Sequence, residues 1–210
     1  MTSEAALYWE NRYRQNGRSW SGRVNVALER EVGGVAPGTA LDLGCGEGGD
    51  ALWLAHNGWS VTAVDIAPSA IAIGAAAQGQ EDDIDWVVAD LADWQPPREY
   101  DLVTASFLHS FVDLPRDAIL RRAATAVAPG GLLLVVGHAG APHWAAHTSH
   151  EGEVVELPNP DEMLAALRLD PAGWTVLTRA LVERPIIAPD GSTSTIDDSV
   201  LKLRREPASS

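Results

Sequence analysis

A glycine-rich segment between an apolar strand and a helix constrains this chain more than any other feature. The apolar stretch Thr39–Leu43 predicts a strand, and residues 50–56 predict a helix that stops at Asn57-Gly58. Between them lies Gly44-Cys45-Gly46-Glu47-Gly48-Gly49, which contains the G-x-G-x-x-G spacing of a dinucleotide-binding loop. The segment therefore predicts a Rossmann-like α/β fold with a ligand at the helix N-terminus.

Strand-like and helix-like stretches alternate through most of the sequence, which is typical of a parallel sheet covered by helices. Two late strands, 174–185 and 195–204, are separated by the turn Pro189-Asp190-Gly191 and predict an antiparallel hairpin at the sheet edge. We therefore expect a doubly wound, mostly parallel sheet of seven strands. The other predicted elements are strands at 60–65, 84–89, 100–106 and 132–137, helices at 3–13, 25–32 with Asn25 as its N-cap, from Pro68, 114–128 and 160–167, and a long loop at 137–158.

Length and charge exclude several classes of protein. The 210 residues, 46% of them hydrophobic, support a single domain at 1–210. A net charge of −14 disfavours nucleic acid as a partner, and the scattered cations offer no membrane-binding face. Short apolar runs and the acidic start Met1-Thr2-Ser3-Glu4 predict neither a membrane span nor a signal peptide, so we expect a cytoplasmic protein. The single cysteine, Cys45, permits no internal disulfide.

Carboxylates around the glycine segment indicate which ligand suits it. Asp42 lies two residues before the first glycine, Glu47 lies within the segment, and Asp50 opens the helix. These charges would repel a pyrophosphate, which needs donors and no competing carboxylates. The pattern instead favours a ligand whose near end carries an ammonium or sulfonium group and whose own carboxylate uses the free backbone N–H groups.

Five segments in order resemble the motifs of the class I S-adenosylmethionine-dependent methyltransferases. The run Leu41-Asp-Leu-Gly-Cys-Gly-Glu-Gly-Gly-Asp50 is similar to the first motif of the family. Asp65 stands where the family binds the ribose hydroxyls, and Asp90-Leu91 stands where it recognises adenine. Tyr100-Asp101-Leu102-Val103 and Ala128-Pro129-Gly130-Gly131-Leu132 resemble the two later motifs. Within this core, the resemblance implies donor binding by Asp42, Gly44, Cys45, Gly46, Asp65, Ile66, Asp90, Leu91, Ser106 and Phe107.

Each of these aspartates also has a structural alternative. Asp42 can be a solvated charge at a strand end, and Asp65 can cap a helix. Asp90 can close a turn, with Asp93 as a competitor for its role. Taken together, such alternatives explain the ordered set of motifs poorly.

The N-terminal stretch Tyr8-Trp9-Glu10-Asn11-Arg12-Tyr13 is similar to the start of the tellurite-resistance and thiopurine-type methyltransferases. That resemblance implies a helical lid over residues 1–36, a core over 37–206 and a disordered tail at 207–210. Arg12 or Arg14 would then hold the methionine carboxylate of the donor, and Trp20 would shield its methyl group. For Trp9 and Tyr13 we expect simple packing of the helix onto the sheet.

Histidines near the strand ends are candidates for acid–base chemistry. His109 follows the fourth strand and His138 the fifth, and either is a candidate catalytic base for an acceptor that carries a proton. A structural histidine or a pocket wall is the alternative, and many members of the family need no catalytic residue. We expect the histidines of the loop after the fifth strand to line the pocket and not to bind a metal, namely His143, His147 and His150.

The sequence favours a small molecule as the methyl acceptor. Nucleic-acid amino-methyltransferases carry an Asn-Pro-Pro-aromatic signature after the fourth strand, and this signature is absent there. The partial match Asn159-Pro160-Asp161 follows the fifth predicted strand and lacks the second proline and the aromatic residue. Two alternatives remain open: a nicotinamide-dependent oxidoreductase using the same loop, and a protein that binds S-adenosylmethionine without catalysis. The loop carboxylates and the lack of a Tyr-x-x-x-Lys pair, with Lys202 the only lysine, count against the oxidoreductase.

Overall fold

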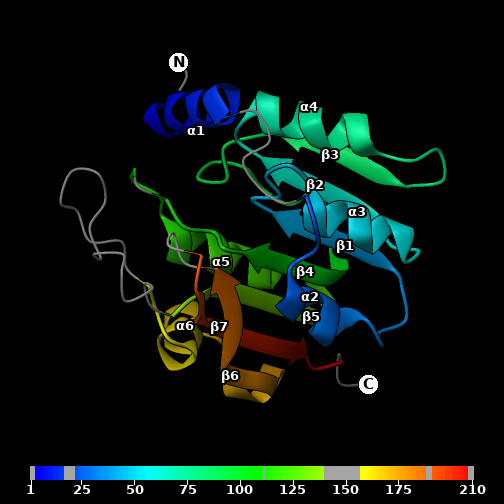
Figure 1. Cartoon of the computed structure of the whole chain (residues 1–210). Coiled ribbons are helices and arrows are strands. Elements are labelled where there is room, and N and C mark those ends of the chain that lie inside the picture. Colours follow the sequence, from blue (N-terminus) through cyan, green and yellow to red (C-terminus); the bar gives the residue numbers. More distant parts are fainter. Residues whose placement is uncertain (1–2, 17–21, 111, 140–156, 188–190, 208–210) are drawn as a thin grey trace.

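A seven-stranded sheet forms the centre of the molecule (Figure 1). The computed structural model describes residues 3–16, 22–110, 112–139, 157–187 and 191–207. The spatial order of the strands is β3-β2-β1-β4-β5-β7-β6, and only the pairs made by β7 are antiparallel. The predicted sheet with its C-terminal hairpin is therefore confirmed. The strands are β1 Thr39–Leu43, β2 Ser60–Asp65, β3 Ile84–Val88, β4 Tyr100–Ser106, β5 Val127–His138, β6 Trp174–Ile187 and β7 Thr193–Arg205.

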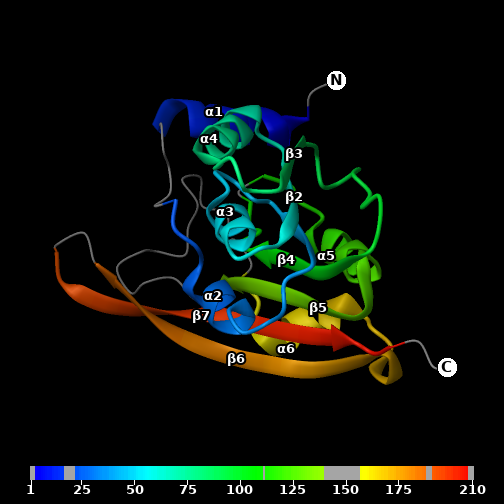
Figure 2. The same ribbon diagram turned by 90° about the vertical axis from the view of Figure 1, so that its right-hand side faces the viewer.

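Helices cover both faces of the sheet (Figure 2). The helices α2 and α3 share one apolar cluster with Ala40 of β1, and α5 and α6 share another with Leu41 and Leu43. This division follows from the alternation of side chains along a strand that is buried on both faces. Within the described residues, no helix is long and apolar enough to cross a bilayer. The helices are α1 Glu4–Asn16, α2 Val26–Val32, α3 Gly49–His56, α4 Pro68–Ala77, α5 Arg116–Thr125 and α6 Pro160–Leu167, with a 3₁₀ turn at Pro171–Gly173.

The structure corrects the predicted boundary between the helix at 114–128 and the strand at 132–137. The helix α5 ends at Thr125, and β5 already begins at Val127, where it pairs with Tyr100 of β4. The pairing register then shifts before Leu102, and Gly130 adopts a φ of +82°. The Pro-Gly-Gly signal therefore marks an irregularity inside a strand, where pairing with β4 overrides the local turn preference.

Trp86 of β3 supports the glycine loop from behind. Its indole Nε1 donates a hydrogen bond to Gln78 Oε1 at 2.8 Å. The ring packs where both Gly48 of the loop and Gly74 of α4 have only hydrogen on the α-carbon. A β-carbon at position 74 would lie 2.5 Å from Cη2 of the indole. The loop, α4 and β3 therefore meet through one side chain and two glycines.

We expect Gly74→Ala to lower the free energy of unfolding by about 1–3 kcal/mol, because the added methyl group displaces the indole. The higher helix propensity of alanine, about 1 kcal/mol, acts in the opposite direction. Urea denaturation measures the difference. Gly34→Ala is the matched control, since no atom lies within 4 Å of a β-carbon built there. A Gly74→Ala protein as stable as the control would contradict this account of the loop support.

Candidate functional site

A cavity of about 1430 Å³ opens over the carboxyl ends of β1, β2, β4 and β5. The strand order reverses between β1 and β4, and ligands of doubly wound sheets bind at such a point. Trp20 lies outside the described residues. Arg14, the alternative to Arg12, is exposed and is not among the lining residues. The following residues expected from the sequence line this one cavity: Arg12, Asp42, Gly44, Cys45, Gly46, Asp65, Ile66, Asp90, Leu91, Ser106, Phe107, His109 and His138.

The glycine loop forms the floor of the cavity and is fixed by Asp65 at the end of β2. Gly44 and Gly46 have φ values of +70° and +54°, a region that side chains disfavour. The N–H of Gly46 donates to Asp65 Oδ2 at 2.9 Å, and the N–H of Ala67 donates to Oδ1 at 2.9 Å. Burial raises the pKa of this carboxyl, and its backbone hydrogen bonds act against the rise. Asp65 therefore shapes the loop in addition to facing the cavity.

Three carboxylates lie close together at the loop, with Asp42 and Asp65 buried and Asp50 half-buried. Burial, followed by repulsion from Asp50 and Asp65, raises the pKa of Asp42 well above its usual value. Burial also raises the pKa of Asp50, which accepts a hydrogen bond from the N–H of Asn25 at 2.6 Å. Among the described residues, Asp42 Oδ2 is buried and has no hydrogen-bond partner. An unsatisfied buried acceptor of this kind points to a missing donor or cation.

The helix α1 brings a cation to the cavity. Arg12 lines the cavity, and its buried Nε has no hydrogen-bond partner among the described residues. The helix is fastened to α4 by Glu10, which accepts hydrogen bonds from the N–H and the hydroxyl of Ser69 at 3.0 and 2.6 Å. These two bonds lower the pKa of Glu10. Tyr13 packs with Trp9 against the start of α4, whereas the sequence predicted packing onto the sheet.

Asp90 closes a turn, which is the structural role that the sequence offered as an alternative to adenine binding. Its Oδ1 accepts a hydrogen bond from the N–H of Ala92 at 2.9 Å, and its Oδ2 accepts one from the hydroxyl of Ser3 at 2.8 Å. The residue also lines the cavity below the start of α1. It therefore closes a turn and contacts the N-terminal segment, while its two oxygens keep further lone pairs.

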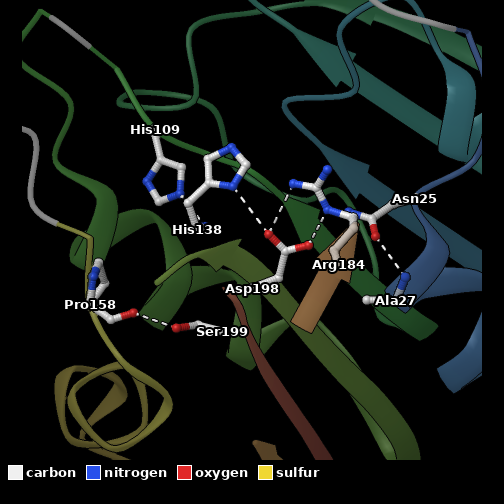
Figure 3. A network of polar contacts seen from close by, with 8 residues as sticks. All are labelled: Asn25, Ala27, His109, His138, Pro158, Arg184, Asp198 and Ser199. Atoms are coloured by element: carbon white, nitrogen blue, oxygen red, sulfur yellow. Dashed lines mark hydrogen bonds and ion pairs between the residues drawn. The ribbon is translucent and has the colours of Figure 1, made fainter. Parts of the chain in front are cut away.

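The two candidate histidines lie close to one another beside Asp198 and Arg184 (Figure 3), and both line the cavity. His109 Nε2 accepts a hydrogen bond from the backbone N–H of His138 at 3.2 Å. Burial, with smaller contributions from Arg116 and His138, lowers the pKa of His109 to about 4. His138 contacts Asp198 of β7, which in turn binds Arg184 of β6.

Arg184 and Asp198 are functional candidates that the sequence did not reveal. Each stands beside another charged residue in an alternating strand, Glu183 and Asp197 respectively, and only the pairing of β5, β6 and β7 brings them to the cavity. Among the described residues, no group of three or more histidine, cysteine, aspartate or glutamate side chains is arranged to hold a metal ion. His143, His147 and His150 lie outside those residues. Burial and the nearby carboxylates raise the pKa of Cys45, which disfavours a thiolate there.

Residues 40–131 match the family model described as a methyltransferase domain. Over these residues, which are less than half of the chain, the sequence is similar to the methyltransferase family. The resemblance seen in its motifs is thereby confirmed. The domain is 34% identical over 120 residues to hemagglutinin 1 of Eikenella corrodens, covering 54% of this chain and 38% of that protein. It is 31% identical over 107 residues to the 2-heptyl-1-hydroxyquinolin-4(1H)-one methyltransferase of Mycobacteroides abscessus, covering 49% and 47%. The matched part spans less than half the length of each relative.

Solved structures share the fold of this methyltransferase domain across nearly its whole length. TehB from Haemophilus influenzae aligns with a TM-score of 0.70 at 18% identity, covering 94% of this chain and 67% of that one. The N-methyltransferase NodS from Bradyrhizobium japonicum WM9, in complex with S-adenosyl-L-homocysteine, aligns with a TM-score of 0.67 at 18% identity, covering 96% and 99%. At such identities the likeness concerns the fold alone.

We expect Asp42→Asn to stabilise the ligand-free domain by on the order of 1 kcal/mol at pH 7.5 and by much less near pH 4. Because the folded state raises the pKa of Asp42, it holds the proton more tightly than the unfolded chain does. This group therefore makes stability fall as the pH rises above the unfolded value of about 4. Asparagine keeps the shape of the side chain and removes that term.

Urea denaturation of both proteins at several pH values measures the effect. The matched control is Asp85→Asn, at an exposed position of β3. A stability difference that stays constant or shrinks as the pH rises would show that Asp42 carries no burial penalty.

Proposed function

We propose that this domain is an S-adenosylmethionine-dependent methyltransferase that acts on a small molecule. The observation that carries the proposal is the cluster of the buried Asp42 and Asp65 with the half-buried Asp50 at the glycine loop, in which Asp42 Oδ2 has no partner among the described residues. Buried carboxylates of this density suit a ligand that carries positive charge near the loop. The methyltransferase model, which covers residues 40–131, supports the same ligand.

The residues around the loop fit the parts of such a donor by their chemistry. Asp42 offers a buried acceptor to a cationic group, and Arg12 offers its guanidinium to the carboxylate of the donor. Asp65 has one backbone bond on each oxygen, so lone pairs remain for two ribose hydroxyls. Asp90 and Leu91 line the cavity with a polar and an apolar contact suited to adenine.

When bound, the donor supplies an electrophilic methyl group on a sulfonium sulfur. Transfer of that group is an in-line displacement, so the domain must mainly hold the acceptor in place and exclude water. Phe107, Leu108 and Leu114 provide apolar wall on the side of the cavity nearest β4 and α5. These residues would shield the reacting groups and orient an acceptor with apolar surface.

Two other functions use the same fold and differ in what they bind or release. A nicotinamide-dependent oxidoreductase would place a pyrophosphate at the loop, where the carboxylates of Asp42, Asp50 and Asp65 would repel it. A protein that binds the donor without catalysis would share the loop and the cavity but release no S-adenosylhomocysteine. Measurements of ligand binding distinguish the oxidoreductase from the proposed methyltransferase. Measurements of product formation distinguish the non-catalytic binding protein from it.

We expect S-adenosylhomocysteine to raise the melting temperature of the domain and NADH to leave it unchanged. Asp65→Ala should weaken S-adenosylhomocysteine binding at least about tenfold, because it removes the ribose acceptor and releases the Gly46 N–H that shapes the loop. Calorimetry and thermal shift measure both effects. The control is Asp85→Ala on the exposed face of β3. Stabilisation by NADH alone, or an unchanged affinity in Asp65→Ala, would overturn the donor assignment.

Turnover is tested by following S-adenosylhomocysteine release with a panel of thiols, amines, hydroxyl compounds, halides and metalloid oxyanions. The N-hydroxyquinolone named for the Mycobacteroides abscessus relative is a suitable first hydroxyl compound. Ribosomal RNA forms a separate arm, since a 35-residue segment is 49% identical to the ribosomal RNA small subunit methyltransferase C of Alcanivorax borkumensis. Methylation of RNA and of no small molecule would contradict the proposed acceptor class.

A further inference from the structure

A chain of polar contacts at the far end of the cavity is not explained by binding of the donor (Figure 3). His138 Nδ1 lies 3.2 Å from Asp198 Oδ1. Arg184 donates to the same carboxylate twice, from Nε to Oδ2 at 2.6 Å and from its terminal nitrogen to Oδ1 at 3.2 Å. Burial raises the pKa of Asp198, but the bonds from His138 and Arg184 outweigh it and leave the pKa below its usual value. Asp198 is therefore ionised at neutral pH.

The register of the C-terminal strands builds this contact. His138, the last residue of β5, pairs directly with Asp198 of the antiparallel strand β7. On the other side of β7, Asp198 pairs with Val182 of β6, which makes Arg184 its diagonal neighbour. A shift of one residue in either pair would turn these side chains to the opposite face of the sheet. The hairpin thus brings Arg184 and Asp198 to the cavity, although both lie far from His138 in the sequence.

The ionised carboxylate determines which nitrogen of His138 carries the proton. A carboxylate only accepts hydrogen bonds, so the Nδ1–H of His138 donates to Asp198. In the neutral ring, Nε2 then presents its lone pair. The side chain is 36% exposed and lines the cavity, and no partner for Nε2 is found among the described residues. His138 is therefore oriented as a proton acceptor.

His109 is not equipped for the same task. Its Nε2 already accepts the backbone N–H of His138, and its pKa of about 4 makes it a weak base at neutral pH. It supports the backbone of His138 from one side, and its ring stacks on that of His138 with 5.9 Å between centroids. The geometry therefore distinguishes the two histidines that the sequence left equivalent.

Phe107 adds a strained support beneath the same ring. It has a φ of +53°, in the region that non-glycine residues disfavour, and its ring stacks on His138 with 4.3 Å between centroids. The guanidinium carbon of Arg184 also lies over the Phe107 ring, 5.8 Å from its centroid. Backbone strain of this kind gathers at sites where a side chain must be held in one orientation.

The charged and ionisable groups that surround His138 among the described residues, directly or through His109, are His109 from the end of β4, Arg116 from α5, Arg184 from β6 and Asp198 from β7.

We propose that Nε2 of His138 is the general base of this domain and that the acceptor carries an acidic hydroxyl group on an apolar scaffold, an inference that rests on the proposed methyl transfer. A thioether or an uncharged amine attacks with an available lone pair and needs no base, whereas a hydroxyl must lose its proton as the new bond forms. Phe107, Leu108 and Val182 line this end of the cavity and suit an apolar scaffold. His138 is the catalytic residue, while Asp198, Arg184 and His109 position it.

The proposed step balances without any further reactant. The acceptor oxygen forms a bond to the methyl carbon as the carbon–sulfur bond breaks, and that electron pair stays on sulfur. The hydroxyl proton passes to Nε2 of His138, and the charge of the imidazolium is balanced by Asp198. The proton then leaves to solvent when the cavity opens to release the products.

The first test uses the complete wild-type chain with ¹⁵N-labelled histidine. We expect the NMR signals of neutral His138, assigned by their loss in His138→Gln, to show the proton on Nδ1. In Asp198→Asn the amide can donate to Nδ1, so the proton should move to Nε2, which a purely structural role for Asp198 would not require. A wild-type ring protonated on Nε2, or a tautomer unchanged in Asp198→Asn, would overturn the assignment.

The second test follows proton transfer without turnover. The probe is 4-nitrophenol, whose ionised form is coloured, added to the S-adenosylhomocysteine-loaded domain at a pH below the pKa of the free phenol. We expect the wild type to bind it as the phenolate and His138→Gln to reduce that signal at least about tenfold. The control is His56→Gln, which removes a histidine–aspartate pair of the same 3.2 Å length, His56 with Asp82, outside the cavity.

The outcomes of the second test separate this inference from the proposed function. Calorimetry with S-adenosylhomocysteine on each protein reports binding of the donor product and folding of the variants. A wild type that binds S-adenosylhomocysteine but forms no phenolate, or a His138→Gln protein with the wild-type signal, overturns the general base alone. A wild type that does not bind S-adenosylhomocysteine overturns the proposed function and this inference with it.

Discussion

The carboxylate of Asp65 is the link on which the rest of the site depends. It accepts the N–H of Gly46 on one oxygen and the N–H of Ala67 on the other, so one side chain joins the end of β2, the glycine loop and the start of α4. The loop is also held from the strand itself, because the N–H groups of Gly44 and Cys45 both donate to the carbonyl of Val64. The floor of the cavity is therefore an extension of the β1–β2 pairing, and its geometry is as rigid as the sheet.

That rigid floor concentrates negative charge at the expense of stability. Asp42, Asp50 and Asp65 all have raised pKa values, and for Asp42 the two neighbouring carboxylates add to the effect of burial. The surrounding fold has to offset this penalty, which it does with apolar residues buried on both faces of β1, Ala40 on one face and Leu41 and Leu43 on the other. Sites prepared for a charged ligand are commonly destabilised in this way when the ligand is absent. The unsatisfied oxygen of Asp42 belongs to this pattern.

Local sequence signals predicted the part of the fold that local interactions control. The bounds of β1 and β2 were predictable because β1 is a short apolar run followed by glycine and β2 is one that ends at a charged residue. The start of β5 was not, because pairing of Val127 with Tyr100 draws a Pro-Gly-Gly segment into the strand. Arg184 and Asp198 were missed for the same reason, since a strand register connects them to His138 and no local pattern records it. The residues gathered at the cavity match the sequence-based set, while their individual roles stay predictions.

The cavity has two ends that come from different parts of the chain. The matched methyltransferase segment, residues 40–131, contains the glycine loop, Asp65, Asp90 and His109. His138, Arg184 and Asp198 all lie beyond it, on strands that join the sheet through antiparallel pairing. Substitutions in the β6–β7 hairpin can therefore alter this part of the cavity while the glycine loop keeps its support. The two parts are fixed by separate strand pairings in one sheet, so the side chains beside His138 can change without disturbing the contacts that Asp65 makes with the loop.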